Sequence, residues 1–332
     1  MMRFFSSPHL HGGNRSQKIM LLVIVAALPG ILTQLYWFGY GTLFNIIWAT
    51  LLGLLMEAGV MILRRRPVGF FLKDGSVVVT TLLLALALPP MSPWWLVTTA
   101  TLFAVIFGKH IYGGLGNNPF NPAMLGYAIC LISFPVSMTV WTGAGQYLNL
   151  ADQWLWFWTE QGQIDAITQA TPLDVIKHLS GSTIGEMWAA NPDVVAYKAA
   201  MLWINIAYLV GGIALLFLKV FTWHAPVAML AGLAVMAFLF GAGEPDLYAS
   251  ASDHLFLGAT MLGAFFIITD PVSSATSRNG KLIFGAGIGI LTYIIRTWGN
   301  YPDAVAFAVL LMNLAAPLID QYTRPKAYGQ QS

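Results

Sequence analysis

The sequence has few charged residues for its length. Its 332 residues include 16 Lys or Arg and 14 Asp or Glu, which together make up 9% of the chain, whereas soluble proteins average about 25%. A soluble protein of this size needs more charge to cover its surface, so the composition excludes a soluble enzyme, a nucleic-acid-binding protein and a disordered chain. The net charge of +2 is too small to indicate a polyanionic partner.

Cysteine is also nearly absent. The single residue, Cys130, excludes an internal disulfide, a Cys-x-x-Cys redox pair and an iron–sulfur cluster held by this chain alone. The six histidines show no metal-ligand spacing. What the chain has instead is apolar sequence: 57% hydrophobic residues and 12 Trp, with a mean hydropathy of +0.69. Such a composition is typical of a helical membrane protein whose outer surface faces lipid.

Ten apolar segments lie in two groups of five, separated by a polar stretch. They cover residues 19–38, 42–63, 77–88, 94–107, 123–140, 199–218, 225–240, 255–268, 282–295 and 304–319. We therefore expect an all-α polytopic membrane protein of about ten transmembrane helices. The first membrane repeat is predicted over 1–140, an external loop over 141–198, and a second repeat with a cytoplasmic tail over 199–332. The first segment lacks a small-residue cleavage site and is expected to be a retained span.

Basic residues predict the orientation of the chain in the membrane. With the N-terminus in the cytoplasm, all but three of the 16 basic residues fall on the cytoplasmic side. The three on the outside are Lys177, Lys198 and Arg296. Both termini are therefore predicted to be cytoplasmic, and the 141–198 loop to be periplasmic if the source is a Gram-negative bacterium.

An odd number of spans in each half predicts two inverted five-helix repeats. The third and fourth apolar segments of each half have only about 12–14 residues, which reach about 18–21 Å of a hydrocarbon core of about 30 Å. Pro89-Pro90 and Asp270-Pro271 end two of these segments. Short, broken helices at matching positions indicate a binding site near the midplane. Tilted or interfacial helices with nothing bound are the alternative.

The external loop contains the string Thr168-Gln169-Ala170-Thr171-Pro172-Leu173. Pro172 favours an extended backbone at Thr171, which would present the threonine hydroxyl on a loop. The same spacing fits an ordinary helix start, with Thr171 as N-cap and Asp174 in the first turn. From spacing alone, the helix start is the stronger interpretation.

The string resembles the Ser/Thr-x-Ala-Thr flavinylation motif found in the family of Rnf-complex D subunits, which are related to the B subunits of the sodium-pumping NADH:quinone oxidoreductase. The likeness covers essentially the whole chain, through Ser7-Pro8, Leu115–Met124, Gly258–Phe266, Thr269–Val272 and Tyr322–Pro325. It implies FMN bound covalently to Thr171 through a phosphoester, with Thr168 as the first residue of the motif. In that family a flavin transferase attaches this group outside the cytoplasm.

A second match to the pattern, Ser273-Ser274-Ala275-Thr276, competes with Thr171. It is followed by Arg278 and Lys281, so the positive-inside rule places it in the cytoplasm, out of reach of a transferase that acts outside. Thr260 falls within a predicted span. Topology therefore favours Thr171.

Two further groups of polar residues stand out. Asn118 and Asn121 alternate with prolines in a predicted inside loop; Asn-Pro pairs usually start helices, but amides can also pair with the edge of a flavin ring. The resemblance implies a second, non-covalent flavin, riboflavin, near Asn118, Asn121 and Asp270. Glu57 lies deep in a predicted span, where an acid is costly. It is either a buried, protonated or paired structural residue or a contributor to ion or proton passage.

The resemblance implies membership of a six-subunit, redox-driven ion pump in the bacterial inner membrane. Its flavins would relay electrons across the membrane, coupling transfer between NADH and ferredoxin, or another low-potential carrier, to Na⁺ or H⁺ translocation. Dehydrogenase sites are expected on partner subunits, which include another flavin-bearing protein and membrane iron–sulfur proteins. The alternative is a urea-transporter-like channel or small-solute transporter, which has no use for a phosphoester flavin on an external loop.

Overall fold

The computed structural model describes residues 15–161, 167–179, 182–301 and 303–323. The described chain is helical except for one two-stranded ribbon, made of β1 (Trp141–Thr142) and β2 (Thr168–Gln169). The predicted all-α class is therefore confirmed. Ser7-Pro8 and Arg324-Pro325, which carry part of the family resemblance, lie outside the described residues.

Six helices of the described chain are long and apolar enough to cross a membrane. They are α1 (Arg15–Phe38), α2 (Gly41–Leu63), α11 (Pro192–Phe217), α12 (His224–Gly241), α15 (Arg278–Trp298) and α16 (Val305–Thr323). Only 22–44% of the most apolar window of each is buried within the protein. The rest of their surface needs lipid or another apolar partner, as in a polytopic membrane protein.

Shorter helices complete both halves. In the first half they are α3 (Val68–Leu72), α4 (Ser76–Ala87), α5 (Trp94–Leu102), the π-helical segment η1 (Phe103–His110), α6 (Pro122–Ser133) and α7 (Pro135–Thr139). In the second half they are α13 (Ala251–Phe256), α14 (Thr260–Leu262) and the π-helical segment η2 (Gly263–Ile267). As expected, α4 ends just before Pro89-Pro90, because proline cannot continue the hydrogen-bond pattern.

Several predicted spans were wrong in length. The span expected at 199–218 belongs to α11, which begins at Pro192, and the span expected at 255–268 is divided among α13, α14 and η2. The segment expected at 282–295 is part of α15, which begins at Arg278 because the Ser277 side chain accepts a hydrogen bond from the Gly280 N–H as its N-cap. The span expected at 123–140 is interrupted. Its helix α6 ends at Ser133, two residues before Pro135 starts the short helix α7.

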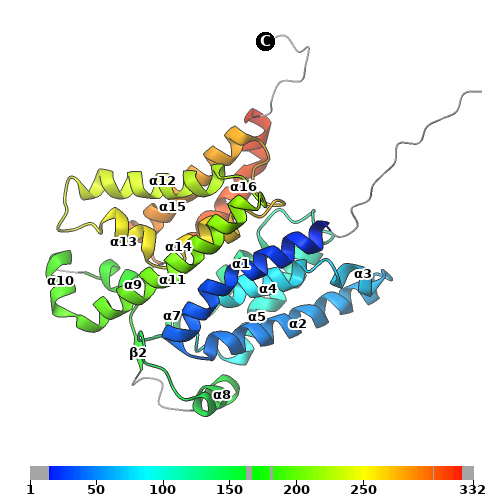
Figure 1. Ribbon diagram of the computed structural model, residues 1–332, viewed down its shortest axis with the longest axis horizontal. Coiled ribbons are helices and arrows are strands. Elements are labelled where there is room, and N and C mark those ends of the chain that lie inside the picture. Colours follow the sequence, from blue (N-terminus) through cyan, green and yellow to red (C-terminus); the bar gives the residue numbers. More distant parts are fainter. Residues whose placement is uncertain (1–14, 162–166, 180–181, 302, 324–332) are drawn as a thin grey trace, which may run out of the picture.

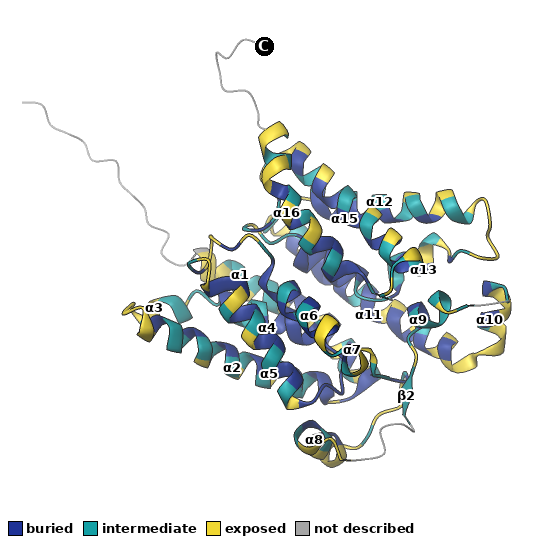
Figure 2. Cartoon of the chain, turned by 180° about the vertical axis from the view of Figure 1, so that it is seen from behind, coloured by how far each residue is buried: buried dark blue, intermediate teal, exposed yellow. Residues whose placement is uncertain are grey.

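The two halves meet along two pairs of helices: α1 packs against α11, and α6 packs against α16. Gly211 makes the first contact close, since a Cβ there would overlap the carbonyl oxygen of Ala26 on α1. Buried apolar residues from both halves form one continuous core. Figure 2 shows these buried residues along the middle of the molecule, with exposed residues on peripheral elements such as α3.

The elements of the polar central stretch gather on one side of the molecule. They are the β-ribbon, α8 (Leu150–Thr159), α9 (Pro172–Lys177) and α10 (Ile184–Ala190). Figure 1 shows β2 and these helices on the side opposite the start of α1 and the end of α16. The central stretch therefore lies on one side of the molecule, and the start of α1 and the end of α16 lie on the other.

Candidate functional site

The β-ribbon and α9 together position Thr171. In the antiparallel ribbon Trp141 lies opposite Gln169, and Thr171 follows two residues later. Its backbone is extended, with φ −67° and ψ 154°, and Pro172 is the first residue of α9. The Thr171 hydroxyl accepts a hydrogen bond from the Asp174 N–H at 3.3 Å. Thr171 is therefore both an extended residue and the N-cap of a helix, as each interpretation of the sequence predicted.

The ribbon is in turn fixed to the end of α1. The Gly145 N–H donates to the Trp37 carbonyl oxygen at 2.8 Å. Thr168, the first residue of the motif, is paired with Thr142 in the ribbon. The motif is thus held to the first half of the protein by backbone hydrogen bonds, while α9 carries the chain on toward the second half.

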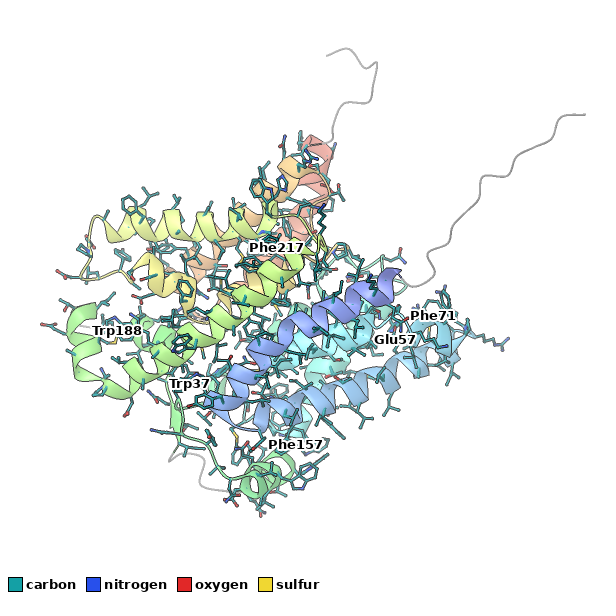
Figure 3. The ribbon with its side chains drawn as sticks, in the orientation of Figure 1. Trp37, Glu57, Phe71, Phe157, Trp188 and Phe217 are labelled. Atoms are coloured by element: carbon teal, nitrogen blue, oxygen red, sulfur yellow. The ribbon has the colours of Figure 1, made fainter. Side chains whose placement is uncertain are left out.

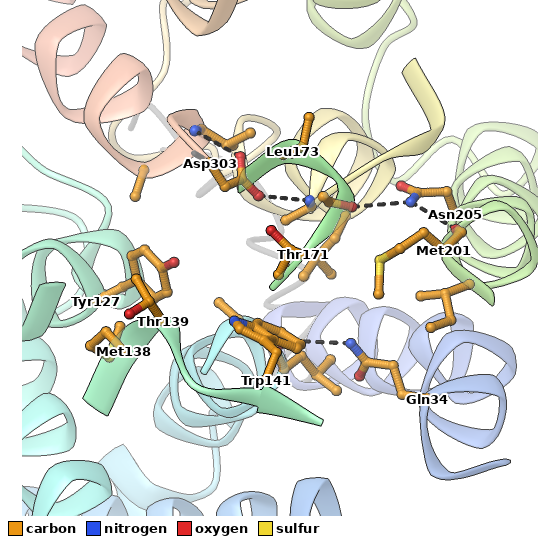
Figure 4. A pocket seen from close by; sticks show the side chains of 18 of the residues that line it. Gln34, Tyr127, Met138, Thr139, Trp141, Thr171, Leu173, Met201, Asn205 and Asp303 are labelled. Carbon is orange, nitrogen blue, oxygen red and sulfur yellow. Dashed lines mark hydrogen bonds between the residues drawn. The ribbon is translucent and has the colours of Figure 1, made fainter. Parts of the chain in front are cut away.

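Thr171 lines a cavity between the two halves (Figure 4). About 1080 Å³ of this cavity is free of atoms, part of it open to solvent. Most of the lining is apolar or aromatic and includes Tyr127, Trp141 and Met201. An apolar concave surface with a few polar groups is the usual form of a cofactor site.

Some polar side chains around the cavity have hydrogen-bond partners among the described residues, and Tyr197 does not. The Tyr208 hydroxyl donates to Gln34 Oε1 at 3.1 Å, and Asn205 Nδ2 donates to the Gly258 carbonyl oxygen at 3.0 Å. Tyr197, by contrast, is 1% exposed, and its hydroxyl has no hydrogen-bond partner among the described residues. A buried polar group without a partner costs about 1–3 kcal/mol. A polar ligand group in the cavity would remove that cost.

A buried arginine fixes the wall of the cavity where α13 and α14 are separated. Gly258 there has a left-handed backbone with φ +63°. Arg296 Nη2 lies 3.0 Å from Asp303 Oδ1, and Arg296 Nη1 donates to the His254 carbonyl oxygen at 2.7 Å. Asp303 Oδ2 accepts from the Ala259 N–H at 2.8 Å. Arg296, which the sequence placed among the external basic residues, is therefore a buried structural residue.

The competing threonines lie elsewhere. The Thr276 N–H donates to Asp320 Oδ1 at 2.9 Å, just before α15. Thr260 is fully buried, and its hydroxyl donates to the His254 carbonyl oxygen at 2.9 Å. Neither is among the described residues that line the Thr171 cavity.

A second cavity contains two of the three residues predicted for the non-covalent flavin. About 1340 Å³ of it is free of atoms, and Asn121 and Asp270 both line it, together with Lys219 and Lys281. Asn118 is not among its described lining residues. Residues near the start of α1 and just after the end of α11 also line it, so it opens near the side opposite α9.

Asn121 connects the two halves beside this second cavity. Its side-chain oxygen accepts from the Met124 N–H at 3.2 Å as the N-cap of α6, which confirms the helix-start interpretation. Its backbone N–H donates to Asn313 Oδ1 at 3.0 Å, and its Nδ2 donates to the Ile267 carbonyl oxygen at 3.2 Å. Asn118 makes a local contact, from Nδ2 to the Phe120 carbonyl oxygen at 2.9 Å.

Glu57 has a buried partner that the sequence reasoning missed. Lys109 Nζ lies 2.7 Å from Glu57 Oε1 and also donates to Ser76 Oγ at 2.7 Å. Glu57 Oε2 and both ring nitrogens of His110 have no hydrogen-bond partner among the described residues. Figure 3 places Glu57 toward the α3 end of the molecule, away from Trp37. The sequence feature that could have indicated this partner is Lys109 itself, which directly follows the apolar run that ends at Gly108.

The described residues contain no group of three or more His, Cys, Asp or Glu side chains that could hold a metal ion.

Comparison with known proteins identifies the family. The model of the NQR2, RnfD, RnfE family matches residues 3–329. The chain is 56% identical over 328 residues to the D subunit of the ion-translocating oxidoreductase complex of Pseudomonas aeruginosa (strain UCBPP-PA14), covering 98% of this chain and 95% of the relative. Proteins of the same name are 50% identical in Marinobacter nauticus, over 98% of this chain and 94% of the relative, and 48% identical in Citrobacter koseri, over the full length of both chains. The family predicted from the sequence is therefore confirmed, and the chain belongs to the NQR2, RnfD, RnfE family.

Proposed function

We propose that the chain is the D subunit of an Rnf-type ion-translocating oxidoreductase complex and that it carries FMN covalently on Thr171. Family membership and the names of its relatives support the first part. The position of Thr171 carries the second part. Its hydroxyl accepts one hydrogen bond from its own helix and borders a largely apolar cavity, in which about 1080 Å³ is free of atoms when the part open to solvent is included.

The residues of the cavity fit a flavin. Aromatic and apolar side chains provide surfaces for a planar ring, and the Tyr197 hydroxyl, which has no partner among the described residues, is available to a polar ring edge. A bound flavin supplies transfer of one or two electrons, while the protein binds and orients it. Thr171 would hold the phosphate end, and Asp303 with Arg296 would keep the adjoining wall at Gly258 in place.

The proposed orientation puts both termini in the cytoplasm and the 141–198 loop in the periplasm of a bacterial inner membrane. Basic-residue distribution supports it. So does the position of β2 and α8–α10 opposite the start of α1 and the end of α16 (Figure 1). In this orientation a flavin transferase outside the cytoplasm reaches Thr171 but not Thr276. The paired contacts of α1 with α11 and of α6 with α16 support two inverted repeats.

A second flavin, riboflavin, is proposed for the cavity that Asn121 and Asp270 share. Two flavins on opposite sides would let electrons cross the membrane in steps. Asn118 lies outside the described lining of that cavity, so the proposal rests on the other two residues. NADH and ferredoxin sites, with their iron–sulfur clusters, belong on partner subunits, because this chain has one cysteine.

Glu57 is proposed as a point on the path of the translocated Na⁺ or H⁺. Its Oε2 and the His110 ring nitrogens lack hydrogen-bond partners among the described residues, and His110 Nε2 lies 3.7 Å from Glu57 Oε1, so these atoms could take a proton or cation. The Lys109 ammonium supports a structural role as well, since it balances the carboxylate charge.

The transporter alternative shares the architecture but not the flavin. In-gel flavin fluorescence of the denatured chain, after co-expression with a flavin transferase, separates the two. The proposal expects fluorescence in the wild type and none in Thr171→Val. A non-fluorescent wild type, with the transferase shown to be active, would favour the transporter.

A further inference from the structure

We propose that Trp141 positions the flavin, because its indole forms the surface against which the isoalloxazine ring packs in the Thr171 cavity. This inference rests on the proposed attachment of FMN to Thr171. It assigns a role to a residue outside the flavinylation motif, about 30 positions away in the chain, that the ribbon brings next to the motif.

The β-ribbon fixes how near Trp141 is to Thr171. Trp141 is directly opposite Gln169, and opposite residues in an antiparallel pair have Cβ atoms about 4.5–5.5 Å apart. Thr171 lies two residues beyond Gln169, and both Thr171 and Trp141 line the same cavity. Figure 4 shows the Trp141 indole below the Thr171 side chain. A ring tethered to Thr171 and housed in this cavity must therefore come close to Trp141.

The indole packs against a buried ring. The Trp141 and Phe38 rings make a T-shaped contact, with centroids 5.9 Å apart and an interplanar angle of 71°. Phe38 is fully buried and packs in turn against Tyr197, with centroids 5.4 Å apart. This row of rings fixes the orientation of Trp141 while leaving it half-buried at the cavity.

Hydrogen bonding sets Trp141 apart from other tryptophans on the same side of the molecule. The indole N–H of Trp156 donates to the Met91 carbonyl oxygen at 2.9 Å, and that of Trp48 donates to Thr98 Oγ1 at 2.9 Å. The Trp141 indole N–H has no hydrogen bond to any described residue. Indole N–H groups at partly buried sites usually find a partner. The half-buried Trp141 side chain thus lines the cavity with an indole donor that has no partner among the described residues.

The test compares native and denatured flavin fluorescence of the full chain, co-expressed with the flavin transferase and purified in detergent. An indole in contact with a flavin quenches its emission by electron donation to the excited ring, a phenol does so too, and a benzene ring does not. We compare the wild type with Trp141→Phe and Trp141→Tyr, and with Trp37→Phe as the control. Trp37 adjoins the ribbon but is not among the described lining residues of the cavity.

The proposal expects native emission, normalised to bound flavin, to rise in Trp141→Phe toward that of the denatured chain. Emission should stay quenched in Trp141→Tyr and in Trp37→Phe. If Trp141 had only a structural role, native flavin emission would change in both Trp141→Phe and Trp141→Tyr or in neither, because both variants keep an aromatic ring. Unchanged emission in Trp141→Phe, or an equal rise in Trp37→Phe, would overturn this inference while leaving covalent FMN intact. Absence of in-gel fluorescence in the denatured wild type would instead refute the proposed function.

Discussion

Lys109 Nζ lies 2.7 Å from Glu57 Oε1, and the two side chains are each 1% exposed. The contact joins η1 to α2. Lys109 also donates to Ser76 Oγ at 2.7 Å, and Ser76 Oγ donates to Asp74 Oδ1 at 2.6 Å. Three segments of the first half therefore converge on one buried ammonium group, which balances an acid that would otherwise be costly inside a membrane.

Removing the ammonium should destabilise the protein strongly. Lys109→Met leaves the Glu57 carboxylate buried without its counter-charge, and breaking a buried ion pair in this way costs about 3–5 kcal/mol. Adding Glu57→Gln to Lys109→Met should recover part of the loss, because the double variant buries no charge at this pair. Thermal unfolding in detergent measures both effects. A Lys109→Met protein as stable as the wild type would refute the structural role of the pair.

The Arg296–Asp303 pair should matter for the stability of the cavity wall. Asp303→Asn removes the charge that faces Arg296 Nη2 at 3.0 Å, and hydrogen bonds to charged groups contribute about 1.5–3 kcal/mol. Asp246→Asn is the matched control, because Asp246 is exposed and surface substitutions usually stay within about 0.5 kcal/mol. Unfolding of both variants in detergent gives the comparison. Equal stability of the two would show that the pair does not hold the wall.

Close packing of the two halves predicts a difference between two glycines. A Cβ at Gly211 would overlap the Ala26 carbonyl oxygen, whereas one at Gly59 would meet nothing within 4 Å. Gly211→Ala should therefore destabilise the protein by about 1–3 kcal/mol through overpacking. Gly59→Ala should be neutral or stabilising by up to about 1 kcal/mol, because alanine favours a helix over glycine. Thermal unfolding that ranks the two variants in the reverse order would contradict the α1–α11 contact.

The second cavity should hold a flavin that denaturation releases. Asp270→Asn and Asn121→Ala each alter a lining residue and should reduce the non-covalent flavin per chain, since each lost hydrogen bond weakens binding by about 0.5–1.5 kcal/mol. Asn118→Ala is the control and should keep the wild-type amount. Flavin in the supernatant after acid precipitation is measured, while covalent flavin stays in the pellet. If Asn118→Ala alone lowered the released flavin, the site would have to be sought elsewhere.

Features set by neighbouring residues in the chain could be predicted from the sequence. The end of α4 before Pro89 and the N-cap at Thr171 depend on proline geometry and local hydrogen bonds, and both were correct. Features that depend on contacts between distant segments could not. Positive-inside counting treated Lys109 and Arg296 as charges at the two membrane surfaces, whereas the fold buries them against Glu57 and Asp303.

Helix lengths show the same limit. The length of an apolar run underestimates the length of a helix whose ends are polar. Helix α15 extends past its apolar run at both ends. It reaches Trp298 because the Arg296 side chain in its last turn finds hydrogen-bond partners inside the protein. The cavity at Thr171 also could not be predicted. Its lining comes from both halves of the chain and from the ribbon that pairs Trp141 with Gln169.

The most direct test of covalent flavinylation is in-gel flavin fluorescence of the denatured chain with three matched variants. Thr171→Val, Thr168→Val and Thr276→Val are each co-expressed with the flavin transferase, and protein amounts are matched by staining. Fluorescence should disappear in Thr171→Val and persist in Thr276→Val; Thr168→Val should keep any flavin it receives on Thr171. Loss in Thr276→Val with retention in Thr171→Val would contradict both the attachment site and the proposed orientation of the chain.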